Sequence, residues 1–319
     1  MFKNFNWKLS LRLGISMILM GWFVFSINWT EIGRAFAVVS YPWLLAAVFW
    51  IVIAVVVSVH KWRLILRAQG MRLEWGELWS IYWAGLFFNN FLPSGIGGDG
   101  MRIIWVRKIT GDGPGAAASV VTERILAAAG LALVGLSACL LKANPSPEIT
   151  ALFALLLLVS LVVVVFMMYG RLPGFVTNKD SKMARFITLF SGHGKLLAEH
   201  PGTVISVILW SAVFQLCVVG VNHCIFNGLH IGHVGWLEAM YVIPAVSAAA
   251  MLPLGINGYG IREGAYITLL AATGVPAALS FAASVMFAFL VSIFSLWGGW
   301  VWLRGREKGA YRDVGIEGL

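Results

Sequence analysis

The sequence predicts an all-α polytopic membrane protein, with about six transmembrane helices plus two re-entrant broken-helix hairpins in an inverted repeat. The first observation behind this prediction is composition, because 60% of the 319 residues are hydrophobic and only 12% are charged. A soluble domain carries about 25% charged residues. The second is a set of apolar runs, such as 43–60 and 149–170, each long enough to cross a hydrocarbon layer of about 30 Å as a helix. The third is a Pro/Gly-rich motif that occurs twice, and together they indicate a single membrane domain over 1–319.

The expected spans follow from the apolar runs in chain order: 11–28, 43–60, 114–141, 149–169, 202–226 and 276–302. The first has a basic start and an apolar core without an A-x-A-like cleavage site, so it is expected to be a retained span rather than a removed signal peptide. Two further apolar segments, 75–92 and 236–253, run into Pro/Gly-rich breaks, and short helices are predicted after them at 100–109 and 261–273. Each such pair forms either a broken full span or a hairpin that enters and leaves on one side.

The distribution of basic residues favours two hairpins, at 75–110 and 236–273. If the first pair crossed fully, the loop at 170–200, with five basic residues, would lie outside, against the positive-inside rule. With hairpins, the outer loops hold only Arg34 and Lys142. The expectation is therefore a multi-pass protein of a plasma (bacterial or archaeal cytoplasmic) membrane with both termini cytoplasmic. Its net charge of +9 would then face anionic lipid heads rather than nucleic acid. The segments expected to be cytoplasmic hold these basic residues: Lys3, Lys8, Arg12, Lys61, Arg63, Arg67, Arg72, Arg107, Lys108, Arg171, Lys179, Lys182, Arg185, Lys195, Arg304, Arg306, Lys308 and Arg312.

The Pro/Gly-rich motif is an internal repeat. "LPSGIGGDGMR" (92–102) aligns without a gap to "LPLGINGYGIR" (252–262), an offset of 160, with seven of eleven positions identical. Three expected spans separate the two hairpins, which predicts an inverted repeat with halves 1–170 and 171–319. In transporters, broken helices of this kind meet near the bilayer midplane and face a ligand. The glycines are expected to allow reversal and close helix approach, or to offer backbone N–H groups to an anion. These hairpin residues are Pro93, Gly95, Gly98, Gly100, Pro253, Gly255, Gly258 and Gly260.

Ionisable residues at membrane depth are the candidate site. An unpaired charge at the bilayer centre costs about 3 kcal/mol, and three acids and three arginines balance, so a neutral network of six is expected. Asp99 also stands where the N-cap of a half-helix belongs, and neutralising a neighbouring arginine is an alternative role for Glu123. The six residues are Asp99, Arg102, Glu123, Arg124, Arg262 and Glu263.

Arginine after a half-helix N-terminus indicates phosphate recognition. Arg102 and Arg262 occupy this position in both repeats, and a guanidinium offers a two-pronged hydrogen-bond donor to a phosphate. We expect these two and Arg124 to receive a phosphate-bearing head group, with the three acids orienting them. Further hydrogen bonds are expected from Asn90, Asn257 and Tyr259, for which a structural role is the alternative.

Cofactor and metal sites are not expected. Gly95, Gly97 and Gly100 satisfy G-x-G-x-x-G, but the segment before them is apolar helix rather than the strand that a dinucleotide fold needs. His230 and His233 have metal-ligand spacing without a third ligand nearby, and no nucleophile motif is found.

Three segments, "NNFLPSGIGGDGMR" (89–102), "AAASVVTER" (116–124) and "LPLGINGYGIREGA" (252–265), resemble the lysylphosphatidylglycerol synthase transmembrane-domain family of flippase-like membrane proteins. The resemblance implies a lipid-translocating membrane domain. Its members include the flippase half of bifunctional lysylphosphatidylglycerol synthetases and archaeal proteins implicated in dolichol-phosphate-sugar translocation. The bifunctional proteins carry an aminoacyl-transferase domain after the membrane part. Here the chain ends at Leu319, so no synthase activity is expected.

The expected function is lipid transport. The chain would move a phosphate-bearing (glyco- or aminoacyl-phospho)lipid or a polyprenyl-phosphate-linked head group across the plasma membrane. Its partners would be such an anionic lipid and the membrane, with no nucleic acid and with homo-oligomerisation left open. The alternatives are a membrane-embedded transferase or phosphatase acting on lipid-linked phosphates, and a scaffold subunit without turnover.

Overall fold

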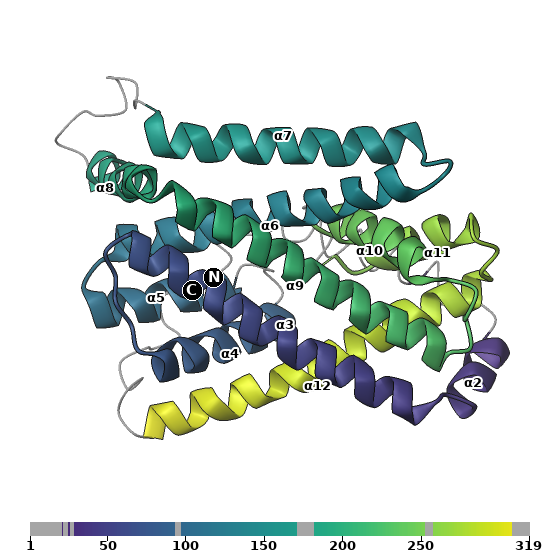
Figure 1. Cartoon of the computed structure of the whole chain (residues 1–319). Coiled ribbons are helices and arrows are strands. Elements are labelled where there is room, and N and C mark those ends of the chain that lie inside the picture. Colours follow the sequence, from purple (N-terminus) through teal and green to yellow (C-terminus); the bar gives the residue numbers. More distant parts are fainter. Residues whose placement is uncertain are drawn as a thin grey trace, which may run out of the picture.

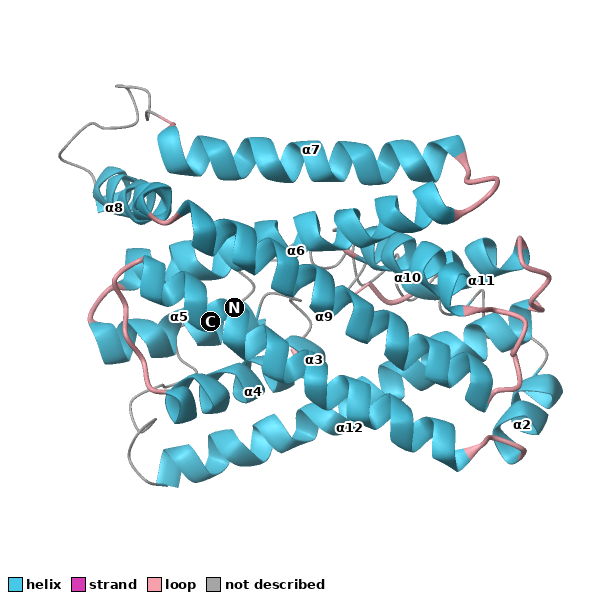
Figure 2. Cartoon of the chain, in the orientation of Figure 1, coloured by secondary structure: helices cyan, strands magenta, loops and turns pink. Residues whose placement is uncertain are grey.

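The computed structural model describes residues 29–92, 97–170, 182–252 and 258–307, together with Gly21 and Phe25. Within these ranges the chain is helical and has no strand (Figure 2), which confirms the all-α class. In chain order the helices are α2 Trp29–Ala37, α3 Tyr41–Ala68, α4 Trp75–Phe91, α5 Gly97–Thr110, α6 Gly113–Leu141, α7 Pro147–Tyr169, α8 Lys182–Leu196, η2 Leu197–Glu199, α9 Pro201–Gly228, α10 Trp236–Ala250, α11 Ile261–Ala271 and α12 Ala277–Glu307.

Five of the described helices are long and apolar enough to cross a membrane: α3, α6, α7, α9 and α12. They coincide with five of the six expected spans, while the span expected at 11–28 lies outside the described residues. The outermost of them, α7, exposes large apolar side chains, and Leu155, Val162 and Phe166 are each more than half exposed. Such a surface is suited to lipid rather than to water, so the multi-pass membrane class is confirmed.

Proline sets the start of most long helices. Proline occupies one of the first two positions in each of α3, α6, α7 and α9, as Pro42, Pro114, Pro147 and Pro201 respectively. The missing N–H costs no hydrogen bond there, because the first N–H groups of a helix have no partner within the helix. Asp112 completes the start of α6, because its Oδ1 accepts a hydrogen bond from the backbone N–H of Gly115 at 2.9 Å. The spans therefore begin where the sequence provides a helix start.

The two shorter pairs of helices form hairpins at opposite ends of the molecule (Figure 1). α4 and α5 contact each other and run in opposite directions, so α5 returns to the end of the molecule where α3 finishes. α10 and α11 do the same at the other end, beside the start of α12. Their breaks at 93–96 and 253–257 lie outside the described residues, and with them Pro93, Gly95, Pro253, Gly255 and Asn257.

The offset of 160 residues extends beyond the repeated motif. Adding 160 to the bounds of α3 gives 201–228, which are the bounds of α9. The same shift carries α4, α5 and α6 onto α10, α11 and α12 to within six residues at each end. Four successive helices thus recur in the same order. The boundary expected between 170 and 171 adjoins residues that are not described, and it stays a prediction.

The aligned glycines serve different purposes in the two hairpins. A Cβ on Gly98 would lie 1.9 Å from the carbonyl oxygen of Gly85, so glycine lets α4 and α5 touch. In the second hairpin Gly258 and Gly260 have φ values of +74° and +85°, which L side chains rarely adopt. Gly100 has neither feature, since a Cβ there would meet nothing within 4 Å. The expectation that space requires glycine is therefore wrong at position 100.

Candidate functional site

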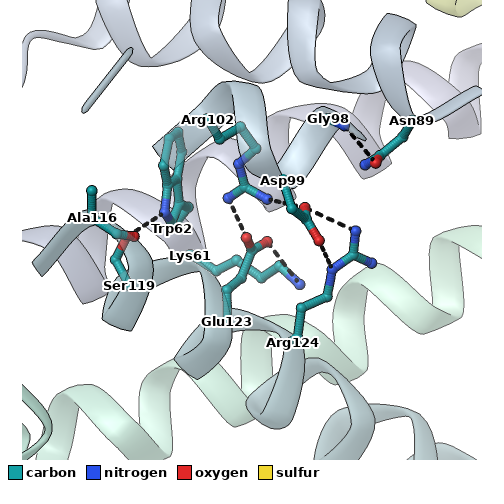
Figure 3. Close-up of polar contacts among 10 residues, drawn as sticks. All are labelled: Lys61, Trp62, Asn89, Gly98, Asp99, Arg102, Ala116, Ser119, Glu123 and Arg124. Carbon is teal, nitrogen blue, oxygen red and sulfur yellow. Dashed lines mark hydrogen bonds and ion pairs between the residues drawn. The ribbon is translucent and has the colours of Figure 1, made fainter. Parts of the chain in front are cut away.

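Five charged side chains meet beside the first break, where α3, α5 and α6 converge (Figure 3). Three of them are almost fully buried, with side-chain exposures of 3% for Lys61 and 5% for Arg102 and Glu123. We call this group the cation cluster, and its members are Lys61 of α3, Asp99 and Arg102 of α5, and Glu123 and Arg124 of α6. The sequence predicted four of these five residues.

The cation cluster lies well inside the helices. Glu123 is ten residues after the start of α6, which is about 15 Å along the axis at a rise of about 1.5 Å per residue. Lys61 is seven residues before the end of α3, or about 10 Å from it on the same basis. Both side chains are buried inside the bundle, away from the helix ends, so each charge there needs a partner.

Arg102 is held by two acids and an aromatic ring. One of its terminal nitrogens donates a hydrogen bond to Glu123, and the other lies 3.5 Å from Oδ1 of Asp99. Its guanidinium carbon lies 4.0 Å from the centroid of the Trp62 ring, a cation–π contact. Trp62 is fixed in turn, because its Nε1 donates a hydrogen bond to Ser119 Oγ at 3.2 Å. The orientation of this guanidinium is therefore set before any ligand arrives.

Asp99 joins α5 to α6. Arg124 donates to both of its carboxylate oxygens, from Nε at 2.9 Å and from Nη2 at 3.0 Å. Because α5 begins at Gly97, Asp99 lies inside the first turn instead of preceding it. The alternative role as an N-cap is therefore wrong, and the carboxylate acts as the partner of two arginines. Arg124 is the outermost member of the cluster, with its side chain 55% exposed.

Lys61 was assigned by sequence to a cytoplasmic segment, whereas the structure buries its side chain inside the bundle. The assignment followed from its neighbours Arg63 and Arg67, but α3 continues to Ala68 and carries Lys61 inside. Its Nζ lies 3.5 Å from Oε1 of Glu123 and 4.9 Å from the centroid of the Phe214 ring. The spacing of Ser58, Lys61 and Trp62, which places them on one helix face, was the signal available in the sequence.

The cation cluster has one more basic side chain than acidic ones. Three basic side chains face two carboxylates, and Glu123 is shared between Arg102 and Lys61. Arg262 and Glu263 do not join them, because they form a separate pair on α11. The expected neutral network of six residues is therefore wrong. Its members divide into a cluster with a formal charge of +1 and a neutral pair.

A cavity of about 180 Å³, which we call the first cavity, adjoins the cation cluster. Asn89 borders it and accepts a hydrogen bond from the backbone N–H of Gly98 at 3.0 Å, so this amide closes the hairpin. Basic donors around a small cavity suit an oxyanion such as a phosphate. The lining residues are Ser58, Lys61, Tyr82, Gly85, Leu86, Asn89, Arg102, Glu123, Arg124, Ala127 and Phe214.

The second hairpin holds a neutral counterpart. Arg262 Nη2 donates to Oε1 of Glu263 at 2.8 Å, and Ser284 on α12 donates to the same oxygen at 3.2 Å. The other oxygen of Glu263 accepts from the backbone N–H of Gly260 at 2.6 Å. The ring centroid of Tyr259 is 5.1 Å from the guanidinium carbon of Arg262. The charge of Arg262 is thus already compensated by its neighbour in the chain.

A cavity of about 230 Å³, the second cavity, adjoins Arg262. Its lining also includes Asn222, which accepts a hydrogen bond from the hydroxyl of Tyr266. With the offset of 160, Ser284 occupies the position equivalent to Arg124, and Val221 occupies the position equivalent to Lys61. Equivalent helices of the two halves therefore carry different side chains at these positions. The surplus basic side chain is found in the first half.

The remaining predicted residues lie apart from the cation cluster. Asn90 lines a further cavity between α3, α4, α9 and α12. The described part of the chain contains no group of three His, Cys, Asp or Glu side chains arranged to hold a metal ion. His230 contacts the carbonyl oxygen of Val38 at 2.9 Å through Nε2, which is a structural contact between the ends of α2 and α9.

The chain matches a known family model. The model described as "Lysylphosphatidylglycerol synthase TM region" matches residues 9–299, a range that includes both hairpins and all but the end of α12. No curated protein matches the chain.

Proposed function

We propose, for a chain that belongs to the lysylphosphatidylglycerol synthase transmembrane-region family, a flippase-like transport activity. Its cargo would be a phosphate-bearing lipid head group, carried across the plasma membrane, with both chain termini on the cytoplasmic side. Family membership supports a membrane protein that acts on lipids, and the finer assignment rests on one observation. This observation is the surplus of one basic side chain over the acids in the cation cluster, beside the first cavity.

The physical argument concerns compensation of charge. Each uncompensated charge at the bilayer centre costs about 3 kcal/mol, and the cation cluster has one more base than acid. A phosphodiester carries one negative charge, so its arrival would neutralise the cluster. Arg102 offers a fixed guanidinium, Lys61 a compact ammonium, and the half-exposed Arg124 lies where a ligand would enter. Such a site favours an anionic head group over a neutral one.

The arrangement of the hairpins suits alternating access. They lie at opposite ends of the molecule, and each adjoins its own cavity. Repeats of this kind in transporters open a central site to one side of the membrane at a time. An enzyme acting on lipid-linked phosphates is the alternative. It would need a nucleophile or a free pair of acids, whereas Asp99 and Glu123 are both engaged by bases.

The decisive experiment removes the excess charge. Lys61→Gln should lower both the anionic lipid that co-purifies with the protein and the rate of leaflet exchange in proteoliposomes, each by about tenfold, the effect of about 1.4 kcal/mol. Arg67→Gln is the matched control, since Arg67 is an exposed base on the same helix. Lipid recovered by mass spectrometry identifies the cargo. Equal exchange in both variants, or chemical conversion of the lipid by the purified protein, would contradict the proposal.

A further inference from the structure

A third cavity, of about 170 Å³, lies between α3, α4, α9 and α12, and we call it the middle chamber. It shares lining residues with both polar cavities. With the first cavity these are Ser58, Tyr82, Leu86 and Phe214, and with the second they are Val218 and Phe287. The three cavities therefore adjoin one another in a series from the cation cluster to Arg262.

One face of α9 follows the whole series. Phe214 borders the first cavity, Val218 borders the middle chamber, and Asn222 borders the second cavity. These residues are four apart, so they lie on one helix face with steps of about 6 Å along the axis. The apolar stretch between the two polar cavities is therefore short.

The lining of the middle chamber is predominantly apolar. Phe214 stands at its junction with the first cavity, where the ammonium of Lys61 lies 4.9 Å from the ring centroid. Phe287 stands at its junction with the second cavity. The other lining residues are Ile51, Ala54, Val55, Ser58, Tyr82, Trp83, Leu86, Asn90, Val218, Val221, Val291, Phe294 and Ser295.

A cavity with this lining offers a water molecule few polar partners. Apolar cavities in proteins stay dry because a water molecule inside finds too few polar partners. Apolar constrictions in channels block ions for the same reason, because an ion cannot pass without its hydration shell. The polar cavities on either side offer hydrogen-bonding groups, and the middle chamber interrupts them.

We propose that the middle chamber, bounded by Phe214 and Phe287, is a dry barrier that prevents protons and ions from passing between the two polar cavities. The proposal goes beyond lipid transport, because it assigns to these side chains the protection of the ion gradient across the membrane. It requires that the two polar cavities be hydrated from opposite sides of the membrane.

Thiol reactivity measures hydration of the chamber directly. In a variant without the three native cysteines, Ala127→Cys places a thiol in the first cavity and Ser295→Cys places one in the middle chamber. A charged, water-soluble methanethiosulfonate should modify position 127 and leave position 295 unmodified. Adding Phe214→Ala should make position 295 reactive. Rapid modification of position 295 with Phe214 intact would overturn the proposal.

Ion leak through proteoliposomes is the second measurement. Val291→Thr and Val221→Thr keep the side-chain volume and add a hydroxyl to the chamber, so the proton leak should rise about tenfold, the effect of about 1.4 kcal/mol. Val213→Thr, at an exposed position on α9, and Phe289→Ala, at an exposed position on α12, are the controls. If Phe214→Ala reduces the folded yield, the two threonine variants still test whether the chamber blocks protons. A leak equal to wild type in every folded variant would also overturn the barrier.

The two proposals fail separately. Wild-type protein that exchanges no lipid would contradict the proposed function, while the thiol comparison would still decide whether the chamber is dry. Normal lipid exchange with a hydrated chamber would overturn the barrier alone.

Discussion

Arg102 and Arg262 occupy equivalent positions in the repeated motif, but their surroundings differ. Arg102 shares its main acid, Glu123, with Lys61 and stacks on Trp62. Arg262 has Glu263 as a neighbour in the chain and a further contact with Ser284. The same side chain thus shares its main acid with a second base in the first half and has an acid of its own in the second.

We therefore predict unequal effects of Arg→Lys at the two positions. Lysine keeps the charge but loses the planar guanidinium that pairs with a phosphate through two hydrogen bonds. Arg102→Lys should lower lipid retention and leaflet exchange by about tenfold or more, the scale of one lost charge-assisted hydrogen bond. Arg262→Lys should change both by less than about threefold on the same scale.

The measurement pairs co-purified lipid with leaflet exchange on the same preparations. Melting temperatures serve as the control, because Arg102→Lys also loses its stacking on Trp62. A loss of lipid that follows only the loss of melting temperature would identify Arg102 as a structural counter-ion. Equal effects at both positions would contradict the asymmetry described here.

At the scale of the element, the first hairpin depends on close contact between α4 and α5. Gly98 contacts Gly85 so closely that a Cβ would lie 1.9 Å from a backbone oxygen, while Gly100 has open space around it. Both lie within α5. The hairpin therefore contains a matched pair of glycines, one required by packing and one not.

We predict opposite consequences for alanine at these two positions. Gly98→Ala should separate the two helices and lower folded yield and melting temperature, with a cost of several kcal/mol typical of overpacking. Gly100→Ala should leave folding intact and raise stability by about 0.5–1 kcal/mol, because alanine is the better helix former. Size-exclusion profiles and melting curves in detergent provide the comparison. Equal tolerance of both changes would show that the hairpin does not rely on the contact.

At the scale of the whole molecule, the five long described helices run between two ends, and each end carries one hairpin (Figure 1). The described parts of the loops at the end shared with α4 and α5 carry Arg72 and Asp112, and those at the other end carry His233 and Ala272. If the hairpins are re-entrant, each hairpin begins and finishes on one side of the membrane. This is a statement about topology that labelling tests.

We predict that cysteines at 72 and 109 react only from the cytoplasmic side, and that cysteines at 233 and 272 react only from outside. All four positions are exposed, so failure to react reflects the side of the membrane rather than burial. The background lacks the buried Cys139, Cys217 and Cys224. Membrane-impermeant maleimide applied to intact and to opened cells gives the readout. Labelling from opposite sides within either pair would contradict re-entrant hairpins.

The sequence by itself determined the class of protein and the positions of its five long described helices, but it did not predict α2 or α8. Hydropathy and helix-breaking residues are local properties, so α3, α6, α7, α9 and α12 were anticipated from length and composition alone. The motif at 92–102 and 252–262 also indicated the offset of 160, which the bounds of four further pairs of helices follow. The repeat can be recognised in the sequence because equivalent residues of the two halves keep a constant separation along the chain.

Only the tertiary structure decided which charges meet. Lys61 lies 62 positions before Glu123 and was grouped with loop residues, because a run of bases near the end of a span reads as cytoplasmic. Its inclusion depends on where α3 ends and on how α3 is rotated against α6, and neither is encoded in a local pattern. Arg262 and Glu263 were expected in the same network but remain apart, because their hairpin packs at the other end. The excess charge beside the first cavity arises from this packing of distant helices, since pairing at membrane depth is set by contact in space and not by proximity in the chain.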